Sequence, residues 1–467
     1  MNARGVLLLL SLTACVANAQ RPEPSPLATR EAAETAAASW IRSNLTPFAT
    51  DIPTTEELKP LLAKLASARL IGLGESTHGD HQSQVFKSQV IRHLIADQGL
   101  DQVVFEINRN GGQALDDYVN QGKGDFAEVI RKGGVFKIWQ TDDLASLIGW
   151  MRGYVKQTGK AVHIHGIDCQ LPGSDLKVVF AFLKKVDPKS VAHYTPTFQS
   201  LFDAEAQGKT YLAWRKSRAK GEYKIFADPA KAIEDLLEAK KTKWSNLAGY
   251  DNAVYAARTA YQAFNVFERE FGPQPRDFSN ADPAYISRRD RYMASNLLAR
   301  IGNKRACLWA HDGHVLGEFP VNLVKLGFTS LGRELKQSIH DNYVTVGFTW
   351  STGVIHVKSM TRNKPDLVTL QKAAIPQAAV NANRKGDLGE FFGRFGVDHF
   401  YIDLRDAEEA TRVWGKIAYY RPSLGWIFDP ATFMTDPEEA SPTIPSHDIL
   451  VYSRIVSPST LWVFPEK

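Results

Sequence analysis

Short apolar runs alternate with longer stretches of helical periodicity in the first third of the chain. The runs at 70–73, 102–106 and 161–168 are continuous enough to indicate buried strands. Between the first two, apolar residues recur at helical spacing from Val85 to Ile95, and this pattern stops at Gly99. The order strand, helix, strand predicts a parallel sheet with helices packed against it.

From about residue 172 to residue 300 the pattern is almost entirely helical, with breaks at prolines. A stretch of this length exceeds one crossover helix, so we predict a helical insertion that caps an active-site cleft. Further strands are expected at 304–310, 344–349, 399–404 and 449–453. The run at 353–357 is expected to form a hairpin with 344–349. The predicted fold class is α/β, with a mostly parallel central sheet flanked by helices.

The N-terminus has the pattern of an export signal rather than of a folded element. Basic Met1–Arg4 precedes apolar Gly5–Leu12, and Ala17–Ala19 is a small-x-small cleavage site, so 1–19 is interpreted as a signal peptide. Leu12–Cys15 also resembles a lipobox, which leaves lipid anchoring at Cys15 as an alternative to simple secretion. Residues 20–34 are interpreted as a linker and 35–467 as the domain. No later apolar run is long enough to span a bilayer. We expect an exported protein, periplasmic or secreted.

Composition narrows the classes of function. The chain has 467 residues and a formal charge of only +5, with no basic run interleaved with aromatics, so nucleic-acid binding is not indicated. Cys169 and Cys307 lie in apolar strand-like runs and give no metal-ligand spacing. They are interpreted as buried thiols, with a single disulfide as the alternative.

Three acid–base side chains follow two of the predicted strands. Glu75 and His78 lie on the glycine-rich turn after 70–73, and Glu106 ends the next strand. The carboxyl ends of parallel strands share one edge of a sheet, where active sites collect. His78 is suited to take a proton from water, and the carboxylates can orient it. The alternative is a helix-capping histidine beside a carboxylate that the helix dipole favours.

A second group comes some two hundred residues later. His311 and His314 follow the strand at 304–310, and Arg289 lies on the preceding helix. The two imidazoles could serve as an acid–base pair, as an oxyanion donor or as two metal ligands. A guanidinium can bind an oxyanion or carbonyl oxygen. No Gly-x-Ser-x-Gly elbow is present, so a serine nucleophile is not expected.

Four sequence blocks together resemble the erythromycin esterase family: Gly74–Gly79, Phe105–Glu106, Arg289–Asp290 and Trp309–His314. The resemblance implies a hydrolase that opens a macrolactone ester without a covalent intermediate. It implies His78 as the general base for water, in a cleft lined by the matching glutamates, histidines and arginine. We also assign substrate binding to three neighbouring residues. These are Lys87, Trp309 and Asp312. The family usually has Asn at the position of Asp312, and some members have Arg at the position of Lys87.

The predicted function is therefore hydrolysis of a small-molecule ester or lactone by His-activated water, with no cofactor. Aromatic residues of the insertion are expected to line the cleft, namely Trp214, Tyr255, Tyr261 and Phe264. Two alternatives remain. His78, Glu106, His311 and His314 could instead bind a divalent metal that hydrolyses an ester or phosphoester. The chain could also be a non-catalytic envelope protein that binds a ligand in the same cleft.

Overall fold

The computed structural model describes residues 27–132, 134–268, 271–272, 285, 287–318, 324–325, 327–359, 370–374, 388–419, 427–428, 441–444 and 446–462. The predicted signal peptide, including Cys15, lies outside these residues. None of the helices in the described ranges is long and apolar enough to cross a membrane.

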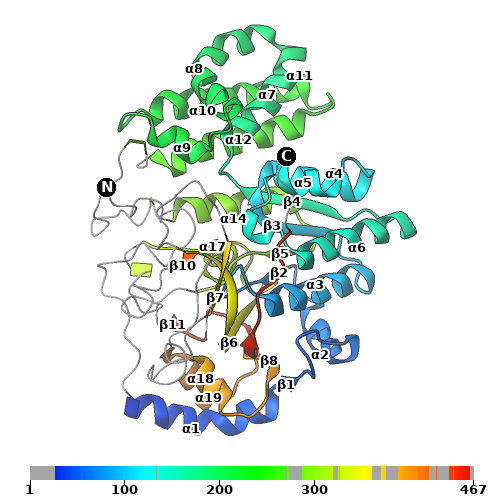
Figure 1. Ribbon diagram of the computed structural model, residues 1–467, viewed down its shortest axis with the longest axis vertical. Helices are drawn as coiled ribbons and strands as arrows, with labels where there is room; N and C mark the ends of the chain where they lie inside the picture. The colour runs from blue at the N-terminus through cyan, green and yellow to red at the C-terminus, as the bar shows by residue number, and fades with distance from the viewer. Residues whose placement is uncertain are drawn as a thin grey trace.

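The centre of the molecule is a mixed, mostly parallel sheet, as the apolar runs predicted (Figure 1). Its strands lie in the order β1-β8-β12-β6-β2-β5-β3-β4. From β12 to β4 each neighbouring pair is parallel, whereas β8 is antiparallel to both β12 and β1. The strands span β1 Thr46–Pro47, β2 Leu70–Leu73, β3 Gln102–Asn108, β4 His163–Asp168, β5 Ala306–Trp309, β6 Tyr343–Ser359, β8 His399–Asp403 and β12 Ile449–Val456.

The position of β5 determines where the site forms. Chain order would place β3 beside β2, yet β5, which follows β4 by more than a hundred residues, lies between them. The turn after β5 therefore lies between the turn after β2 and the end of β3. Because all three strands are parallel, their carboxyl ends meet at one edge of the sheet.

Helices cover both faces of the sheet because its strands are apolar on both sides. Ile71 packs with α2 (Thr55–Leu65), α3 (His81–Ala96) and α6 (Asp142–Thr158) in one core. Leu70, which points to the opposite face, packs with α14 (Arg288–Ile301) and α17 (Leu331–Ile339) in another. Thr54 and Glu57 form a capping box at α2, and Thr141 caps α6.

The insertion between β4 and β5 is helical where the structure describes it, which confirms that prediction. Helices α7 to α12 form a separate layer beyond α4 (Arg109–Gln121) and β4 (Figure 1) and bury a core of their own. They span α7 Pro172–Val186, α8 Pro188–Ala206, α9 Tyr211–Lys216, α10 Tyr223–Ala239, α11 Lys241–Trp244 and α12 Tyr250–Val266.

The aromatic residues that we expected to line a cleft instead hold this helical layer together. Trp214 and Phe264 are buried in its core, where Phe226 packs against both rings. Tyr255 is buried and donates its hydroxyl to the backbone carbonyl of Gly166, and the partly buried Tyr261 packs on the same core. The prediction was wrong because the layer has to bury its own apolar faces.

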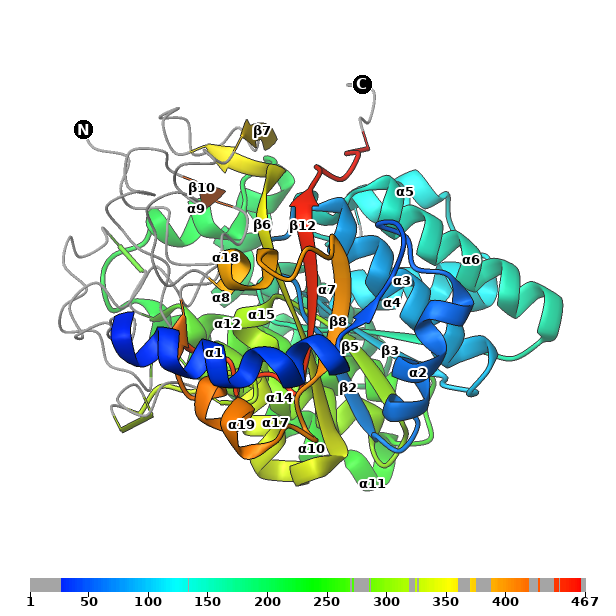
Figure 2. The same cartoon turned by 90° about the horizontal axis from the view of Figure 1, so that it is seen from below.

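Two element boundaries also differ from expectation. α1 spans Leu27–Asn44 and packs beside α19 (Glu409–Gly415) and β8 (Figure 2), so 27–34 is helix rather than linker. The segment 353–357 continues β6 instead of folding back on it, and the antiparallel neighbour at that end is β7 (Leu370–Ala374). The parallel pairing of β6 with β12 extends as far as Gly353, and these backbone hydrogen bonds keep β6 extended.

Several shorter elements are also present among the described residues. They are α5 Phe126–Lys132, the 3-10 helices η3 Lys137–Trp139 and η5 His340–Asn342, α15 Asp312–Val315, α18 Leu388–Gly393, β10 Ile427–Phe428, and the small sheet of β9 Ala418–Tyr419 and β11 Ser441–Pro442. Cys169 and Cys307 are both buried free thiols, which agrees with the first of the two interpretations.

Candidate active site

Two turns from distant parts of the chain pack directly against each other at the sheet edge. The backbone N–H of Asp312 donates to the carbonyl oxygen of Glu75 at 2.8 Å. A Cβ on Gly74 would lie 1.8 Å from a carboxylate oxygen of Asp312, so the approach requires glycine there. This contact brings His311, which caps the short helix α15, beside His78, and the two ring centroids are 5.0 Å apart.

His78 and Glu75 form a buried pair. Nδ1 of His78 bonds to Oε1 of Glu75, and the exposed fractions of the residues are 3% and 0%. Burial alone would raise the pKa of the Glu75 carboxyl, but the Lys87 ammonium and His78 outweigh it and lower the pKa. A carboxylate only accepts hydrogen bonds, so Nδ1 of His78 carries a proton, and in the neutral ring Nε2 carries the lone pair. No hydrogen bond among the described residues occupies that Nε2.

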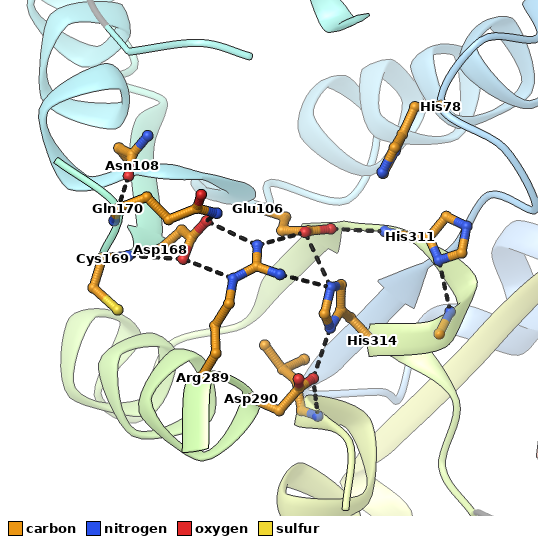
Figure 3. Close-up of polar contacts among 12 residues, drawn as sticks. His78, Glu106, Asn108, Asp168, Cys169, Gln170, Arg289, Asp290, His311 and His314 are labelled. Atoms are coloured by element: carbon orange, nitrogen blue, oxygen red, sulfur yellow. Dashed lines mark hydrogen bonds and ion pairs between the residues drawn. The ribbon is translucent and has the colours of Figure 1, made fainter. Parts of the chain in front are cut away.

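Glu106 connects the two groups predicted from the sequence (Figure 3) and lies two residues before the end of β3, which extends past the predicted strand end at Glu106 to Asn108. Its Oε1 lies 2.9 Å from Nη2 of Arg289 and 3.1 Å from Nε2 of His314. Its Oε2 accepts the backbone N–H of His311 at 3.0 Å. Burial would raise the pKa of this carboxyl, but His314 and Arg289 hold it well below its usual value. Glu106 is therefore a fixed anion.

Arg289 is held on two sides by carboxylates. Its Nε and Nη2 donate to the two carboxylate oxygens of Asp168 at 3.0 and 2.8 Å, and Nη2 also bonds to Glu106. Asp168 ends β4 and accepts further hydrogen bonds from the Cys169 N–H and the Gln170 amide (Figure 3). These bonds engage Nε and Nη2, and Nη1 faces Nε2 of His314. Arg289 therefore supports the carboxylates of the site.

His314 is a cation in this setting. Nδ1 lies 2.7 Å from the Asp290 carboxylate, and Nε2 lies 3.1 Å from Glu106. Burial would lower its pKa, but Asp290 and Glu106 outweigh it and raise the pKa to about 10. Nη1 of Arg289 approaches Nε2 of His314 to 3.2 Å, and Glu106 bonds to both cations. Because both ring nitrogens bond to carboxylates, His314 supports the site rather than exchanging protons.

His311 has the opposite character. Its Nδ1 accepts the backbone N–H of Gly313 at 3.1 Å, and burial lowers its pKa to about 3. The ring is therefore neutral, with its proton on Nε2. That N–H is buried and has no hydrogen-bond partner among the described residues. A buried donor left unpaired costs about 1–3 kcal/mol, which a ligand oxygen would recover.

The three residues assigned to substrate binding lie behind this site. Lys87 is fully buried and bonds to Oε2 of Glu75, with its ammonium 3.9 Å from the centroid of the Trp309 ring. Asp312 accepts the backbone N–H of Phe348 on β6 at 3.1 Å. Lys87 and Trp309 form a support beneath Glu75, and Asp312 ties its turn to β6. Their assignment to substrate binding stays a prediction, and the contacts described here give them a supporting role.

The geometry bears on metal binding as well. Among the residues that the structure describes, no group of three or more His, Cys, Asp or Glu side chains could hold a metal ion. Glu106 is bonded to Arg289 and His314, and the Nδ1 atoms of His78 and His311 are both engaged. The Nε2 atoms of His78 and His311 remain available, and two ligands are fewer than a typical zinc site uses.

The fold and these contacts define an α/β protein with a buried acid–base site at the carboxyl edge of a parallel sheet. The erythromycin esterase family model matches residues 95–447, and the chain belongs to that family. It is 21% identical over 401 residues to the erythromycin esterase type II of Escherichia coli, covering 79% of this chain and 89% of that protein.

Two solved structures share the fold. A Bacillus cereus protein matches with a TM-score of 0.74 at 22% identity, covering 92% of this chain and 99% of the other. A mutant of the erythromycin esterase EreC in its open conformation matches with a TM-score of 0.61 at 14% identity, covering 90% and 100%. These likenesses confirm the fold predicted from the sequence.

The structure adds three residues to the predicted site. Asp168 binds Arg289, Asp290 binds His314, and Trp139 donates its indole N–H to Glu75 at 2.9 Å. The sequence could have indicated Asp168, because it ends a predicted strand, and Asp290, because it directly follows Arg289. Nothing in the local pattern around Trp139 indicates its contact, because its partner lies 64 positions away in the chain.

Proposed function

We propose that the protein hydrolyses a neutral carboxylic ester or lactone with water activated at His78. One observation carries the proposal. Two neighbouring imidazoles each leave Nε2 unengaged by the described residues, and their protonation states are complementary. His78 offers a lone pair for a proton, and His311 offers an N–H for an oxygen. This pairing suits attack of water on a carbonyl.

The steps balance without a covalent enzyme intermediate. His78 Nε2 takes a proton as the water oxygen bonds to the carbonyl carbon, and the negative charge on the carbonyl oxygen is met by His311 Nε2–H. The imidazolium formed at His78 is stabilised by the Glu75 carboxylate. When the carbon–oxygen bond to the alcohol breaks, His78 returns its proton to the leaving oxygen. The products are a carboxylic acid and an alcohol, and in the case of a lactone both groups belong to one ring-opened hydroxy acid.

The charge of the site supports a neutral ester over a phosphoester. Its carboxylates are Glu75, Glu106, Asp168 and Asp290, and its cations are Lys87, Arg289 and His314. There is one more carboxylate than cation, and each cation bonds to a carboxylate. An additional phosphate charge would meet net repulsion here. The name of the Escherichia coli relative makes macrolactones the first substrates to test.

The experiment is a screen of purified protein against macrolides and aryl esters, with product mass as the readout. We expect a gain of one water, with the ¹⁸O of labelled water in the acid product. His78→Ala should lose at least about a hundredfold in kcat. His163→Ala is the matched control, because that histidine lies on β4, has a partly exposed side chain and forms an ion pair with Asp116. Equal activity of His78→Ala and the unaltered protein would overturn the proposal.

The same screen tests the two alternatives from the sequence. Activity that disappears with a chelator and returns with zinc or manganese would favour the metal-dependent hydrolase. Ligand binding by His78→Ala, with no hydrolysis by either protein across the screen, would favour the non-catalytic binding protein.

For localisation, we propose export directed by residues 1–19. The N-terminus and mass of the protein recovered from the cell envelope provide the test. Cleavage after Ala19 supports simple secretion, whereas a lipid-modified Cys15 that a Cys15→Ser variant lacks supports anchoring. An unprocessed chain in the cytoplasm would refute export.

A further inference from the structure

The carboxylate of Glu75 is held by more than its histidine. Oε1 accepts both Nδ1 of His78 and the indole N–H of Trp139, the latter at 2.9 Å, while Oε2 accepts the ammonium of Lys87. Trp139 is 1% exposed and Glu75 is fully buried. Both oxygens are therefore engaged, and the carboxylate plane is restrained from three directions.

Trp139 also contacts the base itself. The ring centroids of Trp139 and His78 are 5.1 Å apart, and the planes meet at 89°. This edge-to-face packing restricts rotation of the imidazole about its side-chain bonds. The same residue thus holds the carboxylate through its N–H and the imidazole through its ring.

The segment that carries Trp139 is tied to the turn that carries His78. Trp139 ends the 3-10 helix η3, and Thr141, two residues on, donates its hydroxyl to the Gln84 side chain at 2.7 Å. The Gln84 amide in turn donates to the backbone carbonyl of His78 at 3.2 Å. Two hydrogen bonds through Gln84 therefore connect the segment of Trp139 to the backbone of His78.

We infer that Trp139 is a positioning residue that keeps the Glu75–His78 pair in its active tautomer. The inference rests on the proposed hydrolysis at His78. With the indole N–H present, Oε1 is held where it receives Nδ1–H, so the lone pair of His78 lies on Nε2. Without it, the carboxylate gains rotational freedom and His78 can exchange its proton between the two ring nitrogens. The value of kcat then falls, because molecules with the proton on Nε2 of His78 cannot accept a proton from water there.

The test is Trp139→Phe, with Trp150→Phe as the matched control. Trp150 lies on α6, where it stacks on Tyr154, and among the described residues it makes no hydrogen bond or ring contact with Glu75 or His78. We expect kcat to fall about tenfold to a hundredfold in Trp139→Phe with little change in KM. The acid limb of the pH profile should move to higher pH, because a Glu75 carboxylate with one donor fewer favours the protonated, inactive form of the base His78. Trp150→Phe should change neither.

A second substitution separates the hydrogen bond from packing. Benzothienylalanine at position 139 keeps the shape of indole but lacks its N–H, and we expect it to reproduce both effects. If Trp139→Phe and the benzothienyl variant fold and retain the kcat and acid limb of the unaltered protein, the inference is wrong. It is equally wrong if Trp139→Phe loses activity and the benzothienyl variant does not, because packing would then be the cause.

A spectroscopic readout distinguishes failure of this inference from failure of the proposed function. Nitrogen-15 NMR of labelled histidine reports which ring nitrogen of His78 carries the proton, and it requires no substrate. We expect Nδ1–H alone in the unaltered protein and a mixture of tautomers in both variants at position 139. An unchanged tautomer in the variants refutes the positioning role, even if no ester is hydrolysed by any form.

Discussion

The buried ion pair between Lys87 and Glu75 makes a strong prediction about stability that does not depend on the substrate. Both residues are 0% exposed, and the ammonium also lies 3.9 Å from the centroid of the Trp309 ring. Lys87→Met removes the cation and leaves a buried carboxylate. Glu75→Gln removes the anion and leaves a buried ammonium. Each single change therefore strands one charge where water cannot solvate it.

The expected magnitude follows from that burial. Removing one partner of a buried pair typically costs about 3–5 kcal/mol in the free energy of unfolding. Both single variants should lie toward the lower end, because the ammonium left by Glu75→Gln keeps the aromatic face of Trp309 and the carboxylate left by Lys87→Met keeps the donors of His78 and Trp139. The double variant carries no stranded charge, and exchange of a buried pair for neutral groups is often close to neutral. We therefore expect it to be more stable than either single variant.

The assay is urea denaturation of all four proteins at pH 7, followed by circular dichroism. Lys59→Met is the matched control, because Lys59 forms a surface ion pair with Glu56 and should contribute less than about 1 kcal/mol. If the losses in the two single variants simply add in the double variant, Lys87 and Glu75 do not interact as described, and the account of how Glu75 is held is wrong.

Two further outcomes test the roles of the paired histidines. His311→Ala should lower kcat about a hundredfold to a thousandfold by removing a donor to the carbonyl oxygen, and His311→Gln should restore part of it through its amide N–H. Unchanged steady-state kinetics in His311→Ala would contradict this. The pKa of His314 is raised to about 10, so its stabilising contribution is complete below about pH 6.5 and is lost as the pH rises through 10. Asp290→Asn should weaken that alkaline loss in urea denaturation between pH 6 and pH 10, and a loss identical to that of the unaltered protein would refute it.

Much of the fold could be predicted from local pattern because buried parallel strands are continuous apolar runs. The turn of Glu75 and His78, Glu106 near the end of β3 and the pair His311 and His314 were all located at strand ends in this way. The role of the aromatic residues in the helical layer could not be predicted from the pattern. A helix that lines a cleft and a helix that packs on another helix have the same periodicity. Trp214 illustrates this, because it packs in the core of the helical layer.

The sequence by itself determined the strands, the glycine turn at Gly74 and which residue types stand at the sheet edge, since these depend on neighbours along the chain. Only the tertiary structure decided what those residues do. His311 and His314 are the same residue type three positions apart, yet their pKa values are about 3 and about 10. The difference arises because Asp290 on α14 and Glu106 on β3 both bond to His314, whereas His311 is buried with only a backbone N–H on its Nδ1. Protonation is set by partners distant in sequence, and they meet only when β5 pairs between β2 and β3.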